Sequence, residues 1–427
     1  MKYNGGHKKV KSLKKVISCL IFMLIGLQFQ LTFAHNTTEN IKVLIDGLPV
    51  SFDSKPIIYD GSTLVPFRAV AESISIKVTW IDETKSIIAE DGQNKVKMQI
   101  NNKNALVNAK SVELDVAPII KDSSTLIPLR FFSEAFGCTV DWDDSLKEVK
   151  IVSPAKEMTI IGYYAIDGNW KCLFTTDYPV AAEGNTNSVN DLYMGWYTLD
   201  KNGNLITNGN KGWQKPEGWE EVLEAANKYD INTEMAINMT DGDNSLTEFL
   251  SDENSMDSAV KNIVKEASLY KGVNIDFEGL GLTDKGEKLY EVKSSFTKFI
   301  SLLYENLKSK NIKLSLALHA PNSSFKGYDY KELAKISDRI IIMAYDFGQK
   351  PEPQNLVIQA VEMAMENVPK EKLFLGISAP SENAESLKTK IGIAKRYDLE
   401  GIAIWRIGLI SNEQWEALKL SAKRKGR

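Results

Sequence analysis

The stretch that decides the fold is residues 272–278, which read Gly-Val-Asn-Ile-Asp-Phe-Glu. Side chains alternate between the two faces of a β-strand, so Asn274, Asp276 and Glu278 share one face and three apolar side chains share the other. This pattern fits a barrel strand whose apolar face packs against helices and whose polar face points inward. With a rise of about 3.3 Å per residue, the two carboxylates stand roughly 6–7 Å apart along the strand.

Seven further apolar runs of similar length occur in the same half of the chain, and helical patterns separate most of them. The predicted strands are residues 158–164, 191–197, 232–238, 272–278, 313–319, 339–346, 372–377 and 401–406. The predicted helices are residues 216–229, 256–270, 285–310, 329–336, 354–367, 384–397 and 412–423, and residues 167–190 are expected to form a loop. Strands that alternate with helices predict a parallel sheet.

The fold class predicted is therefore α/β, and the choice lies between a closed barrel and a doubly wound sheet. Roughly 270 residues suit a (β/α)8 TIM barrel, which typically needs about 250. No Gly-x-Gly-x-x-Gly follows the first run, which counts against a doubly wound dinucleotide fold. Catalytic residues of such barrels lie at the carboxyl ends of the strands, and that rule directs the search for a site.

Three of the predicted strands end in residues that suit a site. Asp276 and Glu278 end the fourth, and repulsion between like charges raises the pKa of one carboxyl, as a general acid requires. Met343 and Tyr345 share a face of the sixth strand, while Trp405 near the end of the eighth could stack on a sugar ring. The alternatives are structural: carboxylates that cap the next helix, a methionine in the barrel core, and a tryptophan that only packs.

An internal repeat occupies the region before the barrel. Residues 43–90 match residues 105–152 at a constant offset of 62, and the sequence Ser-Thr-Leu-Val-Pro-Phe-Arg at 62–68 returns as Ser-Thr-Leu-Ile-Pro-Leu-Arg at 124–130. Each unit predicts short strands, a short helix and then a β-hairpin through Trp80 or Trp142. A small duplicated α+β domain is the expected result.

The first 34 residues predict a secretory signal. A basic stretch at 8–15 precedes an apolar run at 16–27, and Ala34 offers a small residue for cleavage. An uncleaved anchor is the alternative, and no later segment is apolar and long enough to be a transmembrane helix. The two remaining cysteines, Cys138 and Cys172, could form a disulfide, but their expected placement in different domains disfavours it.

The composition and the charge exclude several classes of protein. Hydrophobic residues make up 43% of the 427 and charged residues 25%, as in ordinary globular proteins. The leader carries six lysines and no acidic residue, so its removal takes the formal charge from −4 to −10. An acidic chain is poorly suited to bind nucleic acid through its phosphates.

The repeat resembles the copper amine oxidase N-terminal-like domain of secreted bacterial proteins. Copper chemistry does not follow, because the chain has only three histidines, His7, His35 and His319, which cannot form an imidazole cluster. The functional interpretation is a stalk or a module that attaches to the cell wall or spore surface. The alternative is a packing repeat in which Trp80 and Trp142 are core residues, while Arg68 and Arg130 tie loops by hydrogen bonds.

The barrel half resembles the family 18 glycoside hydrolases, the chitinases and their relatives. Three motifs in the right strand order carry the resemblance: residues 272–278, Met343–Asp346 and Trp405. The family pattern is Asp-Gly-x-Asp-x-Asp-x-Glu, and this chain departs from it with Lys271 and Asn274 in place of the first two aspartates. The Asn-Ile-Asp-Phe-Glu version is similar to the branch that contains spore cortex-lytic N-acetylglucosaminidases and other cell-wall enzymes.

The resemblance implies a substrate-assisted mechanism on an N-acetylglucosamine-containing glycan, with no metal or organic cofactor. Glu278 is then the acid and base, Asp276 orients the acetamido group, and Tyr345 donates a hydrogen bond to its carbonyl. Trp405 is implied to stack under the sugar. The other implied contacts to substrate, directly or through neighbours, are Asn274, Tyr163, Met343 and Asp346. Because Asn274 is neutral, it cannot share a proton with Asp276 as an aspartate would.

One absence separates this chain from many chitinases, which insert a small α+β subdomain after the seventh strand. Here residues 377–380 run directly into the helix expected at 384–397, so a shallow and open groove is expected. Such a groove suits a peptide-substituted glycan.

The expected organisation is a signal at 1–34, a duplicated domain at 35–154 and a family 18 barrel at 155–427. The protein is expected to be secreted and associated with the cell wall or spore. The alternative is a barrel that binds glycan without cleaving it.

Overall fold

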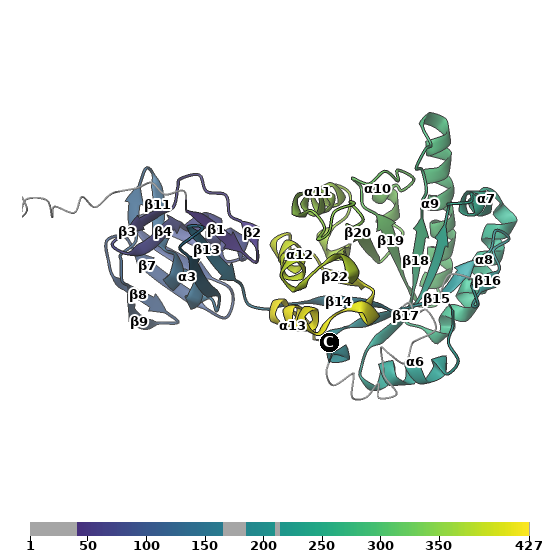
Figure 1. Cartoon of the computed structure of the whole chain (residues 1–427), viewed down its shortest axis with the longest axis horizontal. Helices are drawn as coiled ribbons and strands as arrows, with labels where there is room; N and C mark the ends of the chain where they lie inside the picture. The colour runs from purple at the N-terminus through teal and green to yellow at the C-terminus, as the bar shows by residue number, and fades with distance from the viewer. Residues whose placement is uncertain (1–40, 165–184, 210–213, 427) are drawn as a thin grey trace, which may run out of the picture. The chain divides into compact units, whose positions relative to one another are not determined.

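The computed structural model describes residues 41–164, 185–209 and 214–426. These residues form a small repeat domain, rich in strands, and a larger α/β barrel (Figure 1). The predicted signal at 1–34 and Cys172 lie outside the described residues, as does most of the loop expected at 167–190. Cys138 is a buried free thiol, and burial raises its pKa to about 12.

The elements of the repeat domain recur at the predicted offset. The first repeat contains β1 (Lys42–Ile45), β2 (Leu48–Pro49), β3 (Ile57–Tyr59), β4 (Ser62–Pro66), α2 (Phe67–Ser73), β5 (Lys77–Ile81) and β6 (Ser86–Glu90). The second contains β8 (Asn104–Val107), β9 (Lys110–Glu113), β10 (Ile119–Lys121), β11 (Ser124–Pro128), α3 (Leu129–Ala135), β12 (Thr139–Asp143) and β13 (Glu148–Val152). The remaining strand is β7 (Lys95–Gln99). The predicted helix and hairpin of each repeat are confirmed.

A local two-fold relation joins the repeats through β4 and β11. These strands pair antiparallel, with Leu64 opposite Pro128, Val65 opposite Ile127 and Pro66 opposite Leu126. Equivalent residues therefore face each other in reverse order around the Val65–Ile127 pair. The two outer sheets show the same relation between the repeats. In one sheet, β1 of the first repeat pairs in parallel with β13 of the second. In the other sheet, β8 of the second repeat runs parallel to β6 of the first, and β7 lies between them and pairs antiparallel with both.

The two repeat tryptophans do not form the core of this domain. Trp142 is 36% exposed, and Trp80 is a partly buried residue at the edge of the hydrophobic cluster. Val140 lies on the same strand face as Trp142 and is buried, so Trp142 is one step further toward the hairpin turn, past the edge of the core. The expectation that Trp142 is a core residue is therefore wrong. Arg130 hydrogen-bonds the backbone of a strand and not of a loop, because its Nη1 donates to the Val140 carbonyl of β12 at 2.8 Å.

The second part is the predicted TIM barrel. Its eight strands are β14 (Lys156–Tyr164), β15 (Asp191–Leu199), β17 (Asn232–Thr240), β18 (Gly272–Glu278), β19 (Lys313–His319), β20 (Arg339–Met343), β21 (Leu373–Ser378) and β22 (Gly401–Trp405). Neighbouring strands pair in parallel, and β14 closes the barrel by pairing with both β15 and β22. Two short strands, β16 (Leu205–Ile206) and β23 (Ala422–Arg424), extend β15 and β14.

Helices surround the strands (Figure 1). They are α6 (Trp219–Lys228), α7 (Ser245–Ser251), α8 (Glu253–Glu266), α9 (Gly286–Lys308), α10 (Tyr330–Leu333), α11 (Gln354–Met365), α12 (Ala384–Arg396) and α13 (Asn412–Ser421). Short 3-10 turns are η1 (Thr186–Ser188), η2 (Ala267–Leu269), η3 (Lys370–Lys372), η4 (Ala379–Ser381) and η5 (Ile407–Leu409). The sequence missed α7, whose seven residues are too few to show a clear helical period. Across the described residues, no helix has the length and apolar character to cross a membrane.

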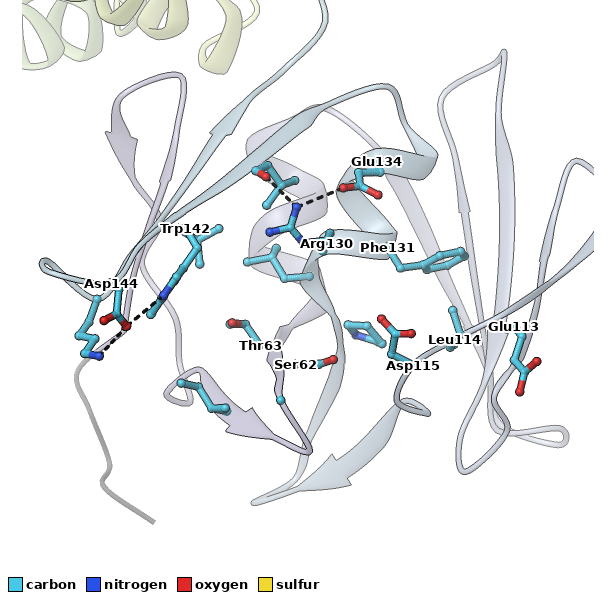
Figure 2. Close-up of a pocket in the computed structure, with 17 residues that line it drawn as sticks. Ser62, Thr63, Glu113, Leu114, Asp115, Arg130, Phe131, Glu134, Trp142 and Asp144 are labelled. Carbon is cyan, nitrogen blue, oxygen red and sulfur yellow. Dashed lines mark hydrogen bonds and ion pairs between the residues drawn. The ribbon is translucent and has the colours of Figure 1, made fainter. Parts of the chain in front are cut away.

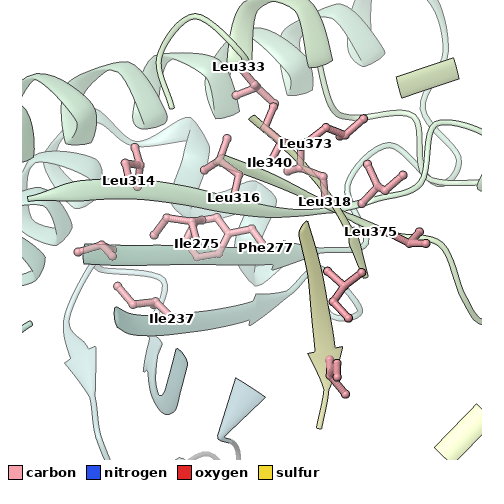
Figure 3. Packing of buried hydrophobic residues seen from close by; sticks show 14 of the residues in the cluster. Ile237, Ile275, Phe277, Leu314, Leu316, Leu318, Leu333, Ile340, Leu373 and Leu375 are labelled. Carbon is pink, nitrogen blue, oxygen red and sulfur yellow. The ribbon is translucent and has the colours of Figure 1, made fainter. Parts of the chain in front are cut away.

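The apolar face of β18 packs against the helices as the alternation predicts. Figure 3 shows Ile275 and Phe277 among the leucines of neighbouring strands, and both side chains are fully buried. The Phe277 ring stacks on Phe299 of α9 at 5.6 Å and meets Phe249 of α7 edge-on at 6.1 Å. The inward face, with Asn274, Asp276 and Glu278, is thereby fixed by packing on the opposite side of the same strand.

We expect Phe277→Ala to lower the free energy of unfolding by about 3–5 kcal/mol, because it opens a cavity between β18 and α9. Urea denaturation monitored by circular dichroism measures the change. Tyr290→Ala serves as a control, since Tyr290 lies on α9 and is 72% exposed. A loss no larger than that of the control would contradict the packing described for β18.

Candidate active site

The two carboxylates at the end of β18 are bridged by an amide from the neighbouring strand. Asn238 of β17 lies directly opposite Asp276 in the parallel register. Its Nδ2 donates to Asp276 Oδ2 at 3.1 Å and to Glu278 Oε1 at 3.0 Å. The sequence analysis missed Asn238, although a signal was present, because this polar residue ends a predicted barrel strand.

Burial dominates the electrostatics of this pair. Asp276 is 4% exposed, and burial raises its pKa well above the ordinary range, with a further rise from the charge of Glu278. Burial also raises the pKa of Glu278, and nearby Asp346 adds to that rise. The Asn238 amide opposes both shifts because it stabilises the charged carboxylates. The pair therefore retains a proton at a higher pH than two separate carboxyls would.

Asn274 connects this site to the interior of the barrel. The Tyr163 hydroxyl donates to Asn274 Oδ1 at 3.2 Å, and Asn274 Nδ2 donates to Ser315 Oγ at 2.9 Å. Ser315 in turn donates its hydroxyl proton to Glu234 Oε2 at 2.7 Å. Both the donor and the acceptor of the Asn274 amide are therefore satisfied inside the barrel.

A second charged layer lies at the amino ends of the strands. Arg339 Nη1 contacts Asp191 Oδ2 at 2.5 Å and Glu234 Oε1 at 3.4 Å. Glu234 is 2% exposed, and burial raises its pKa to about 7 although Arg339 acts in the opposite direction. A cavity of about 460 Å³ with a polar lining reaches these residues. The barrel interior therefore has one charged layer at each end.

The sixth strand is shorter than predicted. It ends at Met343, a buried residue, because Asp346 adopts a left-handed backbone with φ of 63°. Glu352 holds this turn by accepting the backbone N–H groups of Asp346 at 3.0 Å and Phe347 at 3.1 Å. The expected strand over 339–346 was thus three residues too long, because a local hydrogen-bonded turn replaces sheet pairing there.

Tyr345 follows this strand and is electrostatically coupled to the carboxylates. Burial raises the pKa of its phenol well above the ordinary range, and the charges of Asp276 and Glu278 raise it further. The hydroxyl therefore keeps its proton at neutral pH and can act as a hydrogen-bond donor. Asp346 is exposed, and burial with the nearby charge of Glu352 raises its pKa.

Aromatic rings border the carboxylates on the other side. Trp405 at the end of β22 is partly exposed and meets Tyr163 of β14 at 5.5 Å between ring centroids, edge to face. Tyr163 is 4% exposed, and both rings pack on the apolar cluster inside the barrel. The structure thus brings Tyr163 and Trp405, which are 242 positions apart in the sequence, to the same end of the barrel as Asp276.

His319 is a second neighbour of the acid that the sequence analysis did not select. It ends β19, and its Nε2 lies 3.9 Å from Glu278 Oε2 while its ring stacks on Phe325 at 4.0 Å. Burial lowers the pKa of His319 to about 4, so the imidazole is neutral at neutral pH and forms no ion pair. Its position as the last residue of a correctly predicted strand was the available signal.

Among the described residues, no group of three or more histidine, cysteine, aspartate and glutamate side chains is arranged to hold a metal ion.

A parallel barrel with carboxylates at the carboxyl ends of its strands has the architecture common to TIM-barrel enzymes. Residues 159–381, more than half of the chain, match the sequence model of the glycosyl hydrolases family 18. The chain belongs to this family. Residues 44–151 match the copper amine oxidase N-terminal domain, so both resemblances found in the sequence are confirmed.

Solved structures share the fold at low identity. The spore cortex-lytic enzyme SleL of Bacillus megaterium QM B1551 is 18% identical, with a TM-score of 0.53 over 64% of this chain and 76% of that chain. A chitinase of Chromobacterium violaceum ATCC 12472 is 20% identical, with a TM-score of 0.51 over 62% of this chain and 98% of that chain. At these identities the likeness shows the barrel fold alone.

Two curated proteins of Bacillus subtilis (strain 168) are also similar. The uncharacterized glycosylase YvbX is 21% identical, over 36% of this chain and 62% of that protein. The putative sporulation-specific glycosylase YdhD is 29% identical, over 25% of this chain and 26% of that protein. The matches therefore cover less than two thirds of either relative.

The buried carboxyl of Glu234 should make stability depend on pH. Its native pKa is about 7, whereas an unfolded glutamate titrates near its ordinary value, so the native state binds an extra proton between these two pH values. The free energy of unfolding should then fall as pH rises through this window. We expect Glu234→Gln to remove this component, on the order of 1–3 kcal/mol.

Urea titrations at several pH values from acid to neutral measure this slope in the wild type and in Glu234→Gln. Glu416→Gln is the matched control, because its side chain is 68% exposed on α13. Equal pH slopes for the wild type and Glu234→Gln would show that the Glu234 carboxyl does not titrate in the way its burial implies.

Proposed function

We propose that this chain is a glycoside hydrolase that cleaves β-1,4 N-acetylglucosaminyl linkages by a substrate-assisted, retaining mechanism. The observation that carries the proposal is the pair formed by buried Asp276 and partly exposed Glu278, which Asn238 bridges, because it keeps a proton available beside a charged partner. Family membership supports the same chemistry, since family 18 is substrate-assisted. No cofactor is needed for the proposed reaction.

In the first step, Glu278 gives its proton to the glycosidic oxygen as the bond from that oxygen to the anomeric carbon breaks. The carbonyl oxygen of the substrate's own acetamido group bonds to the same carbon and forms an oxazolinium ion. Asp276 orients the acetamido N–H and stabilises its positive charge, and the Tyr345 hydroxyl donates to the acetamido oxygen. Water then opens the ring, and Glu278 takes up its proton.

The remaining site residues are assigned as positioning and contact groups. Trp405 stacks under the sugar bound at the cleavage point, with Tyr163 against its ring and Met343 forming part of the floor. Asn274 holds Tyr163 and Ser315 in place instead of sharing a proton with Asp276. Asp346 is exposed at the rim and is assigned a hydrogen bond to the sugar.

We propose peptidoglycan or spore cortex as the substrate in preference to crystalline chitin. Strand β21 passes through η4 into α12 by Ala384, so no subdomain is inserted after the seventh barrel strand. An open groove accommodates a glycan that carries peptides. The similarity to SleL, a spore cortex-lytic enzyme, agrees with this choice. We further propose that residues 1–34 direct export of the protein and that the boundary between the repeat domain and the barrel lies near residue 154.

We expect Glu278→Gln to lower the release of reducing ends from peptidoglycan and from N-acetylglucosamine oligomers by about 10²–10⁴-fold, because the general acid is lost. Asp276→Asn should also lower it strongly. Muropeptide analysis by liquid chromatography identifies the bond cleaved. Glu416→Gln, on the outer helix α13, is the control. Binding without release by the wild type would instead favour a carbohydrate-binding barrel, which the neutral Asn274 keeps as the alternative.

Asn238 should set the pH range of the reaction. Asn238→Leu removes the donor that stabilises both charged carboxylates, so both pKa values rise and the pH–rate profile moves to higher pH. The profile of kcat/KM on a soluble N-acetylglucosamine oligomer measures this shift. Asn306→Leu, on the exposed side of α9, is the control, and an unshifted profile for Asn238→Leu would remove Asn238 from this role.

A further inference from the structure

A second polar groove lies within the repeat domain. It has a volume of about 510 Å³ and is lined by residues of both repeats. We name it the repeat groove and define it by Ser62, Thr63, Asp115, Arg130, Phe131 and Trp142. Figure 2 shows Trp142 at one end, Glu113 at the other and Arg130 between them. Nothing in the hydrolysis proposed above uses this groove.

Trp142 presents an indole to solvent at a fixed position. Trp142 is 36% exposed, and its Nε1 donates to Asp144 Oδ1 at 3.4 Å. Asp144 is itself held by Lys147, whose Nζ lies 2.8 Å from Asp144 Oδ1. An exposed aromatic face that is oriented before binding suits the apolar face of a sugar ring, because little conformational entropy is lost on contact.

Arg130 is held by contacts of its Nη1 atom, and most of its side chain remains exposed. Its Nη1 reaches the Val140 carbonyl at 2.8 Å and Glu134 Oε1 at 3.4 Å, and the side chain remains 58% exposed. Among the described residues, its Nη2 and Nε make no recorded hydrogen bond, and Arg130 is one of the residues that line the groove. The guanidinium has five N–H donors in total, which suits carbonyl and hydroxyl oxygens.

Hydrogen-bond acceptors gather at the far end of the repeat groove. Within the described residues, neither Glu113 nor Asp115 has a side-chain ion pair. Ser62 and Thr63 add hydroxyl groups from β4. The groove therefore combines an aromatic face with hydrogen-bond donors and acceptors and has no excess of positive charge. This combination matches the apolar and polar sides of a neutral saccharide. It does not match a nucleic acid, which needs cationic contacts.

We propose that the repeat groove binds a hexosamine-containing polysaccharide, with one sugar ring stacked on Trp142. Arg130 donates to the acetamido or hydroxyl oxygens of that chain, and Asp115 accepts its hydroxyl or amide protons. The site tethers the protein to an insoluble glycan and performs no chemistry. It is independent of the hydrolysis proposed for the barrel, and each can fail without the other.

The first repeat supplies a matched control inside the same domain. Trp80 is equivalent to Trp142 and makes the same contact, from Nε1 to Asp82 Oδ1 at 3.3 Å. It does not line the repeat groove, and it is partly buried against the hydrophobic cluster. The position of Phe131 is taken by Ala69 in the first repeat, so the aromatic wall is not repeated.

The test uses the full chain with Glu278→Gln, so that the glycan stays intact during binding. The probe is purified insoluble peptidoglycan, and the fraction of protein that sediments with it is measured over a range of glycan concentrations. We expect Trp142→Ala to weaken binding about tenfold and Arg130→Gln to weaken it several-fold. Trp80→Ala should bind as the parent does, and circular dichroism checks the folding of each variant.

A second measurement separates this site from the barrel, using chains that keep Glu278. Trp142→Ala should release muropeptides more slowly from insoluble peptidoglycan but should cleave a soluble N-acetylglucosamine oligomer at the parent rate. Loss on both substrates, or an equal loss in Trp80→Ala, would overturn the assignment to the repeat groove. Sedimentation of both Trp142→Ala and Arg130→Gln at the parent level would also overturn the assignment to the repeat groove. If no variant cleaves either substrate, the proposed hydrolysis by the barrel is wrong, and the sedimentation test still decides the role of the repeat groove.

Discussion

The candidate site depends on two carboxylates on one face of β18, where Asp276 is buried and the Glu278 side chain is 34% exposed. Removing like charges from water is costly, and the structure offsets that cost with the Asn238 amide, which contacts both groups. Phe277 packs behind the strand between α7 and α9, which fixes the face of β18 that points into the barrel. Oδ1 of Asp276 is buried and has no hydrogen-bond partner among the described residues.

The substitution of asparagine for an inner aspartate follows from the charges at the opposite end of the barrel. Glu234 and Asp191 surround Arg339 there, and Ser315 links Glu234 to Asn274. An aspartate at position 274 would add a fifth carboxylate to the four in these two layers and would lose the donor that Ser315 accepts. The neutral amide adds no negative charge between the two layers and keeps its hydrogen bond to Ser315.

The sequence predicts what depends on local pattern and misses what depends on register. Strand β18 and its two faces follow from alternation, and the repeat domain follows from the constant offset. Asn238 and His319 became site residues only because parallel pairing brings their strand ends next to β18, which spacing along one strand cannot reveal. Trp142 was wrongly expected in the core, since whether a hairpin extends past a core depends on the packing of distant elements.

The open end of the barrel bears on how such a protein could hold an insoluble substrate. The direct passage of β21 through η4 into α12 supports the shallow groove proposed beside Trp405. The acidic charge expected of the chain without its leader gives no general attraction to an anionic cell wall. Binding through a second site on the same chain would raise the local concentration of glycan without any new contact in the barrel. The second repeat differs from the first in its exposed Trp142 and in Phe131, which replaces an alanine. These differences fit the proposal that the repeat domain binds the glycan and the barrel cleaves it.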